Sequence, residues 1–362
     1  MNPPRRLLRD IARWSIGLAV GVGLLWLLFR DTNWTEVGRV LKQADLRWLG
    51  LAVLTLAINY VVRVQRWRYL VEGVRPVAFR ALFSATQIGS LGNFTLPGRI
   101  GEIVRALVLA RLARMPFPQS LALAALDRAT DLAALVLVIL IALFAFTPEH
   151  DVIIDKEVLG WEVRFPEEAV FHAEVGVAAV MVVVMAGLVG LYLNQQLARR
   201  IAHACLTPFS ATLAHRIDTA IDHFAQGLEV LRSRTRMALA MACSLLVWLL
   251  YMGVIVFALT AFGIRAPWYT ALVVQAVVAA ATSIPGAPGF IGQFHAAVII
   301  SLVMVVPDLP PAEAKAVAII AYFINIAVVA VLGGGCLLLE RIALTDLGRR
   351  SVEIEAEEHA QR

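Results

Sequence analysis

The chain has 362 residues, of which 60% are hydrophobic and 16% are charged. Soluble domains contain about 45–50% apolar residues, so this composition, with a mean hydropathy of +0.76, excludes a soluble protein and predicts a multi-pass membrane protein. The net charge of +5 does not indicate nucleic-acid binding, because the basic residues lie at the ends of apolar runs. These runs have the length of helices and do not alternate, which excludes an outer-membrane barrel.

The N-terminal part of the chain predicts two membrane spans. Several arginines precede an apolar run from Trp14 to Phe29. The run lacks the small-residue cleavage pattern of a signal peptide, so we expect a retained first span. After a polar loop, the second span is expected at about residues 48–64. Basic residues gather at and beyond its end: Arg63, Arg66, Arg68, Arg75 and Arg80.

A broken apolar segment, at about residues 81–113, follows the second span. Its centre reads LGNFTLPGRIGEIVR and is interrupted at Pro97-Gly98. Each half has roughly 15 residues, fewer than the ~20 that a span needs. We therefore predict a re-entrant hairpin whose second half begins a helix near mid-membrane. The alternative is a cytoplasmic loop with solvated charges.

The middle of the chain predicts two more spans and a surface helix. The third span is expected at about residues 119–146 and the fourth at about 174–193, separated by an acidic loop. The polar stretch of about 195–236 carries apolar residues at helical spacing, which indicates an amphipathic helix on the inner membrane surface.

The last third repeats the pattern of span, broken segment and span. We expect the fifth span at about residues 237–262, a second re-entrant hairpin at about 268–306 and the last span at about 314–339. The polar tail, residues 346–362, should be cytoplasmic, which leaves residues 1–345 as one membrane domain. The positive-inside rule then gives N-in/C-in topology with about six full spans and one hairpin entering from each side.

The two hairpins share a motif. The run PGRIGE at Pro97–Glu102 is echoed by PGFIGQ at Pro288–Gln293, and GVRPVAFRAL upstream of the first is echoed by GIRAPWYTAL upstream of the second. This predicts a duplicated unit, with repeats at about residues 47–146 and 237–340. Since three full spans separate the hairpins, the repeats should be inverted. Gly/Pro-interrupted segments at corresponding positions of two repeats point to a membrane transport site.

The hairpin breaks suggest an anion site. Helix N-termini bind anions, and Arg99 would add a fork of donors suited to phosphate. Glycines near the breaks let a ligand approach the backbone, although plain helix packing is the alternative. The predicted substrate-binding residues are Arg99, Arg105, Arg63, Arg128, Gly98, Gly101, Gly289 and Gly292.

Three carboxylates, Glu102, Asp127 and Asp131, form a predicted charge network or coupling group. Asp127 and Asp131 share a helix face, while Arg128 should point elsewhere. Their role is either structural neutralisation of Arg99, Arg105 or Arg63, or a gated ion-pair or proton-coupling network. For Arg63, snorkelling to the interface stands beside substrate binding. We expect Asp131 to be mainly the counter-ion of Arg99.

The second repeat carries less charge. It has Phe290 for Arg99, Gln293 for Glu102 and Ala296 for Arg105, and aligning the last span with the third places Tyr322 and Asn325 at Arg128 and Asp131. The chain shows no motif of a metalloprotease, serine hydrolase or P-loop. We therefore expect no enzymatic activity, no metal and no cofactor.

Three stretches together resemble the membrane region of the lysylphosphatidylglycerol synthase family, a flippase-like membrane family. They are LGNFTLPGRIGEIVRALVLAR, DRATDL and SIPGAPGFIGQF. The family pattern usually has Glu where this chain has Asp127, a change that keeps the charge. Bifunctional members carry a soluble aminoacyl-transferase domain after the membrane region, and this chain ends at Arg362 without one. The resemblance implies lipid translocation or lipid-glycan handling rather than lysyl transfer.

The leading hypothesis is translocation of an anionic phospholipid or polyprenyl-phosphate-type lipid across the inner membrane. Two alternatives are a membrane-embedded transferase or synthase subunit in envelope lipid or glycolipid biosynthesis, and a non-transporting scaffold. The expected partners are membrane lipids with a phosphate-bearing headgroup, with a homo-oligomer or envelope-biosynthesis proteins as further possibilities.

Overall fold

The structure is a computed structural model. It describes residues 19–96, 100–146, 152–154, 163–165, 233–283 and 287–342, with single positions between 172 and 183. The described part is helical apart from an antiparallel ribbon of β1 (Val152–Ile154) and β2 (Val163–Phe165), a small exception to the expected all-helical fold. Almost all of the expected fourth span, the amphipathic helix and the tail lie outside the described residues.

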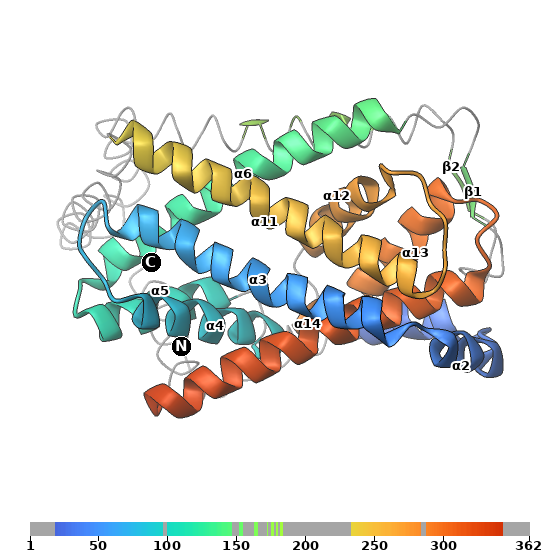
Figure 1. Cartoon of the computed structure of the whole chain (residues 1–362), viewed down its shortest axis with the longest axis horizontal. Helices are drawn as coiled ribbons and strands as arrows, with labels where there is room; N and C mark the ends of the chain where they lie inside the picture. Colours follow the sequence, from blue (N-terminus) through green and yellow to red (C-terminus); the bar gives the residue numbers. More distant parts are fainter. Residues whose placement is uncertain are drawn as a thin grey trace, which may run out of the picture.

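Long helices run along the major axis of the molecule (Figure 1): α3 (Leu46–Val71), α6 (Phe117–Ala145), α11 (Arg234–Ala261) and α14 (Pro311–Glu340). They match four of the predicted spans. By length and composition α3, α11, α14 and the segment Pro288–Val305 could each cross a membrane. A shorter apolar helix, Ala19–Phe29, and the amphipathic α2 (Trp34–Gln43) precede them. The chain is a multi-pass helical membrane protein.

The α3 and α11 helices pack against each other in opposite directions. The backbone N–H of Asp45, at the start of α3, donates to the carbonyl of Ala261, at the end of α11, over 2.8 Å. Further along, the Asn59 amide donates to the carbonyl of Val247 over 2.7 Å. This antiparallel pair forms the centre of the molecule. It also makes the helices that follow α3 and α11 start from opposite ends of the molecule.

Two short helical hairpins follow these two helices. The first is α4 (Phe79–Thr95) and α5 (Gly101–Ala113), and the second is α12 (Thr270–Ser283), the single turn η3 (Pro288–Phe290) and α13 (Gln293–Val305). They occupy opposite halves of the long axis (Figure 1). Their tips meet, because the ring of Phe94 lies edge-on to that of Phe290 with centroids 5.9 Å apart.

Glycines allow the first hairpin to close tightly. Any side chain at Gly101 would collide with the backbone oxygen of Gly89 and with the side chain of Asn93. Gly333 of α14 likewise packs onto α4 at Leu91 and the carbonyl of Gln87. Close backbone contact of this kind is the usual basis of helix packing in membranes.

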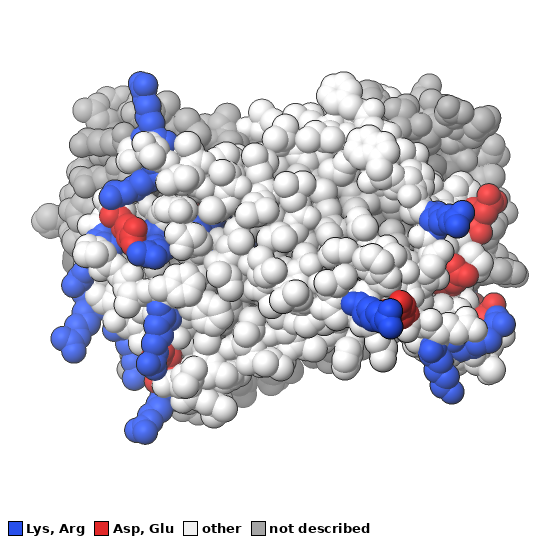
Figure 2. All heavy atoms as spheres, viewed as in Figure 1, with Lys and Arg blue, Asp and Glu red and all other residues white. Residues whose placement is uncertain are grey.

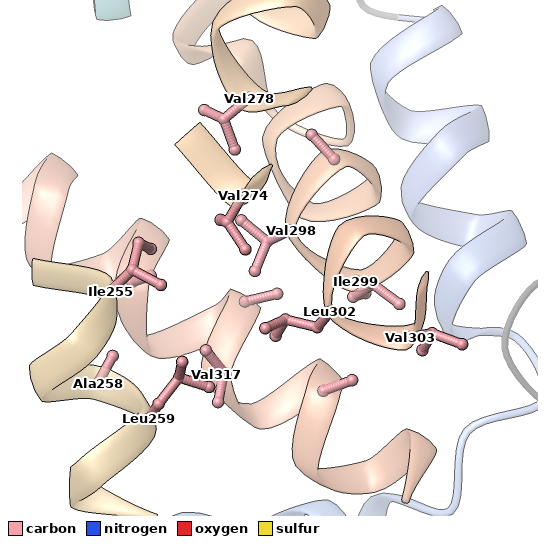
Figure 3. Close-up of a cluster of buried hydrophobic side chains, with 14 of the residues drawn as sticks. Ile255, Ala258, Leu259, Val274, Val278, Val298, Ile299, Leu302, Val303 and Val317 are labelled. Atoms are coloured by element: carbon pink, nitrogen blue, oxygen red, sulfur yellow. The ribbon is translucent and has the colours of Figure 1, made fainter. Parts of the chain in front are cut away.

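Apolar side chains fill the second half of the molecule. Figure 3 shows Val274 and Val278 of α12, Val298 and Leu302 of α13 and Val317 of α14 facing one another. Leu302 and Val317 have no exposed surface. This core holds the second hairpin against α11 and α14.

Charged side chains on the face seen in Figure 2 gather at the two ends of the molecule, with an uncharged belt between them. The end at which α3 finishes and α11 begins carries mostly Lys and Arg, and the opposite end carries both signs. An uncharged belt between polar ends is the surface that a lipid bilayer requires.

Candidate functional site

A cavity of about 320 Å³ lies where the two hairpin tips meet. Its lining comes from both halves of the chain and includes residues of all four long helices and of both hairpins. The polar and aromatic lining residues are Tyr60, Arg63, Ser90, Asn93, Phe94, Glu102, Arg128, Asp131, Trp248, Tyr251, Gln275, Thr282, Phe290, Phe294, Tyr322 and Asn325.

Behind the cavity lies a buried ionic core centred on Asp127. Its carboxylate accepts two hydrogen bonds from Arg66, at 2.8 and 3.0 Å, and one from Arg105 at 2.6 Å. The exposed fractions of these side chains are 0% for Arg66, 1% for Asp127 and 3% for Arg105. The Arg105 guanidinium also lies 3.6 Å from the centre of the Trp67 ring, a cation–π contact. These charges are too deeply enclosed and too well paired to bind a ligand directly.

A second, more open layer of charge lines the cavity. Arg128 of α6 bonds to Glu102 of α5 and, over 3.2 Å, to Asp131 one turn along its own helix. Asp131 also accepts a 2.7 Å hydrogen bond from Arg66, which joins the two layers. Arg128, Glu102 and Asp131 keep 35%, 28% and 17% of their side-chain surface exposed. This layer can exchange partners with a ligand.

Arg63 differs from the other arginines of this region. It lines the cavity and donates to the hydroxyl of Tyr251 over 3.2 Å, and its guanidinium lies 5.6 Å from the centre of the Tyr60 ring. Within the described part of the chain it forms no ion pair with a carboxylate. A guanidinium with donors left over is the natural partner of a phosphate or carboxylate on a ligand.

The second half of the chain gives the cavity an uncharged lining. Gln275 of α12 donates to the carbonyl of Tyr251 over 3.1 Å, and the hydroxyl of Tyr322 donates to the carbonyl of Gly289 over 3.1 Å. Asn325 lies one turn beyond Tyr322 on α14. The aligned pairs Arg128/Tyr322 and Asp131/Asn325 of the two repeats therefore line one cavity.

The structure brings together most of the predicted charged residues but pairs them differently. Arg105, a predicted ligand, pairs with Asp127, which is the structural alternative, and it does not line the cavity. Arg63 does line the cavity and does not pair with Asp127. Arg128 does not point away from the carboxylates, because Glu102 and Asp131 both bind it. Arg99 and Gly98 lie outside the described residues.

The predicted glycines fall into two groups. Gly289 has a φ of +70°, which a residue with a side chain rarely adopts, and it lines the cavity. Gly101 and Gly292 do not belong to the lining. The N–H of Gly101 already donates to Asn93 over 3.0 Å, and Gly292 packs against the backbone of Gly21. Helix packing, the alternative role, accounts for both.

The residue that the sequence analysis missed is Arg66. It was expected among the basic residues at the inner membrane surface, yet its side chain is completely buried and binds both aspartates of α6. The helical spacing of Asn59, Arg63 and Arg66 was the available signal, because residues at i, i+4 and i+7 share one face. A side chain on the face of Asn59 and Arg63 points into the molecule.

Comparison with known proteins gives two results. A sequence model of the family described as the lysylphosphatidylglycerol synthase TM region matches residues 14–333, which confirms the resemblance found in the sequence. The glycosyltransferase AglD of Haloferax volcanii is 27% identical over 358 residues, covering 95% of this chain and 57% of the relative. The chain therefore spans little more than half of the length of that curated relative.

The second comparison corrects one expectation. The absence of catalytic motifs led us to expect no enzymatic activity. A relative that is named as a glycosyltransferase overturns that expectation, because it places an enzyme among the proteins this chain resembles along nearly its whole length. The expectation was wrong because the motifs of metalloproteases, serine hydrolases and P-loop proteins mark only those classes, and their absence does not exclude another kind of enzyme.

Proposed function

The chain belongs to the lysylphosphatidylglycerol synthase transmembrane-region family, and from this premise we propose that its cavity binds the phosphate-bearing headgroup of an anionic membrane lipid and moves it between leaflets. The lipid would be a phospholipid or a polyprenyl-phosphate-type lipid. The step would serve membrane lipid or glycolipid biosynthesis, the setting that the family and the glycosyltransferase relative both suggest.

The observation that carries this proposal is that the guanidinium of Arg63 has no carboxylate partner among the described residues. A charged side chain at membrane depth costs about 2.5–3.5 kcal/mol on insertion scales, and the other described arginines of the ionic core and its open layer offset that cost with carboxylates. Arg63 has only a tyrosine hydroxyl and a tyrosine ring. A phosphate that enters the cavity would complete its partners and those of Arg128.

The balance of charge agrees with an anionic ligand. Four arginines of this region (Arg63, Arg66, Arg105 and Arg128) face three carboxylates (Glu102, Asp127 and Asp131). The described cluster therefore has one positive charge in excess. A phosphate diester carries one negative charge and would neutralise it.

We also propose the membrane arrangement that the sequence predicted. The basic end of α3 and α11 would face the cytoplasm, and α4–α5 and α12–α13 would be re-entrant hairpins of an inverted repeat. The hairpin helices support this, since the 17 residues of α4 and 13 of α5 span only about 26 and 20 Å at 1.5 Å per residue, less than the ~30 Å of a bilayer core. Their meeting tips would place the cavity near the middle of the membrane. Such a membrane protein of a bacterium or archaeon would reside in the cell (inner) membrane.

Reconstitution tests the proposal. Purified protein is placed in liposomes that carry a fluorescent phosphatidylglycerol or a fluorescent polyprenyl phosphate. A membrane-impermeant quencher then removes the fluorescence of the lipids in the outer leaflet. We expect the protected half of the label to become accessible in protein-containing liposomes and to stay protected in empty ones. Identical protection in both would contradict the proposal.

A second function, favoured by the glycosyltransferase relative, is a membrane-embedded transferase that uses the same cavity to hold its lipid substrate. The liposome experiment separates the two. Lipid movement without any sugar donor supports translocation. A new lipid product that appears only with a sugar donor, without movement in its absence, supports transfer.

A further inference from the structure

The lining of the cavity is divided by chemistry. Its charged members, Arg63, Glu102, Arg128 and Asp131, all come from the first half of the chain. Among the described residues from Val247 onward, the lining holds aromatic, apolar and neutral polar residues, with no Asp, Glu, Lys or Arg. A ligand in the cavity therefore meets charge from the first half of the described chain and neutral hydrogen-bonding groups from the second.

The neutral part has unused hydrogen-bonding capacity. The side chain of Asn325 makes no hydrogen bond within the described part of the chain, so its amide offers two donors and an acceptor to a ligand. Gln275 uses one amide hydrogen on the carbonyl of Tyr251, and Thr282 donates its hydroxyl to the carbonyl of Val278. Their oxygens remain available as acceptors. A ligand group with several hydroxyls, each both donor and acceptor, matches this set.

A cationic ligand group does not match this set of neutral hydrogen-bonding residues. The described cluster of arginines and carboxylates already has one positive charge in excess, and the two carboxylates in the lining, Glu102 and Asp131, are already paired with arginines. Burying an unpaired charge is strongly unfavourable. A phosphate diester with an uncharged substituent instead leaves the filled cavity neutral.

The size of the cavity limits what enters it. A volume of about 320 Å³ lies at the small end of ligand pockets, which run from about 300 to 1,000 Å³. The space suits a headgroup, while the hydrocarbon chains of a lipid would remain in the membrane.

We propose that this cavity selects phosphodiester lipids whose headgroup is an uncharged polyhydroxyl group, glycerol or a sugar, over lipids with an amine-bearing headgroup. The phosphate binds at Arg63 and Arg128, and the hydroxyls bind at Asn325, Gln275 and Thr282. This inference rests on the proposed function and adds the class of headgroup to it.

The test is a competition for binding to the full-length protein in lipid nanodiscs. The probes are phosphatidylglycerol, a glycosylated polyprenyl phosphate, phosphatidylethanolamine and a phosphatidylglycerol bearing a lysyl group, each scored by native mass spectrometry. We expect the first two to bind and the two amines to bind at least about tenfold more weakly, the factor that about 1.4 kcal/mol produces. The ratio of the binding of phosphatidylglycerol to that of the glycosylated polyprenyl phosphate shows whether glycerol or a sugar is the preferred headgroup.

Two substitutions at Asn325 make the test specific. Asn325→Leu should reduce the preference for hydroxylated headgroups roughly five- to tenfold, because it removes hydrogen bonds of about 1 kcal/mol each. Asn325→Asp adds a carboxylate and should shift the preference towards the amines. Thr260→Val is the matched control, since this hydroxyl bonds to its own helix on the exposed surface of α11.

The outcomes distinguish the inference from the proposed function. Equal binding of amine and hydroxylated headgroups, or an unchanged preference in both Asn325 variants, would overturn the inference while leaving lipid binding intact. No binding of any lipid by the unmodified protein would overturn the proposed function itself.

Discussion

At the scale of single residues, Asp127 is the point on which two arginines from two other helices converge. Its carboxylate binds Arg66 of α3 and Arg105 of α5. Burying these charges gains little by itself, because desolvation offsets much of the attraction. The arrangement nevertheless fixes the relative positions of α3, α5 and α6, since loss of one partner would leave the other charges buried and unpaired.

Replacing Asp127 with Ala should therefore destabilise the protein by about 3–5 kcal/mol, the cost of breaking a buried ion pair. Thermal unfolding in detergent measures this. The matched control is Glu72→Ala, which breaks the 2.6 Å pair with Arg68 at 31–42% exposure and should cost about 1 kcal/mol or less. Equal shifts of Tm in the two variants would show that the Asp127 cluster does not hold the helices together.

Glu102 occupies a donor of Arg128 that a phosphate would use. The carboxylate therefore competes with an anionic ligand. We expect Glu102→Gln to bind phosphatidylglycerol several-fold more tightly, with a steeper dependence on salt because the cavity gains positive charge. Weaker binding by Glu102→Gln in nanodiscs would mean that Glu102 helps the ligand rather than competing with it.

At the scale of elements, the first hairpin depends on two glycines that face each other. A methyl group at Gly101 has no space between the backbone of Gly89 and the Asn93 side chain. Gly101→Ala should therefore destabilise the protein by about 1–3 kcal/mol, as overpacking does. Gly50→Ala in α3 is the control, because nothing lies within 4 Å of an added methyl there, and it should be neutral or slightly stabilising. A Gly101→Ala variant that unfolds at the same temperature as the unmodified protein would contradict this tight packing of the first hairpin.

The hairpins also make a prediction about access from the two sides of the membrane. In a cysteine-free background, a cysteine at Arg80 or Arg114 should react only from the cytoplasm, and one at Trp268 or Asp308 only from outside. Two complete spans in each hairpin would give the same result for these four. A cysteine at Phe94, at the tip, decides between them, and ready labelling of Phe94 from the outside would refute the re-entrant arrangement.

At the scale of the whole molecule, the apolar runs predicted where the long helices lie, and the repeated Pro-Gly motif predicted two hairpins. Aligning the last span with the third also predicted that Tyr322 and Asn325 correspond to Arg128 and Asp131, and all four line one cavity. What the sequence could not supply was the pairing of charges. The second span was predicted to end at about residue 64, with Arg66 just beyond it, yet α3 continues to Val71. Arg66 can lie inside the helix bundle because Asp127 compensates its buried charge.

The position of Arg99 shows another limit. The sequence makes it a predicted ligand at the hairpin break, but it lies outside the described residues. Of the two described arginines that line the cavity, Arg63 is the one without a carboxylate partner. The linear sequence did not show which of several arginines in an apolar segment would lack a carboxylate, since that depends on helices that are distant along the chain.

The most direct measurement is lipid movement by Arg63→Gln in liposomes, compared with the unmodified protein and with Thr260→Val. Arg63 has no carboxylate partner among the described residues, so its removal strands no buried charge and Tm should stay near that of the unmodified protein. The account predicts that movement of fluorescent phosphatidylglycerol falls at least about tenfold, or by about 1.4 kcal/mol, while Thr260→Val retains it. Movement at the unmodified rate by Arg63→Gln of equal thermal stability would contradict the claim that this cavity binds the lipid phosphate.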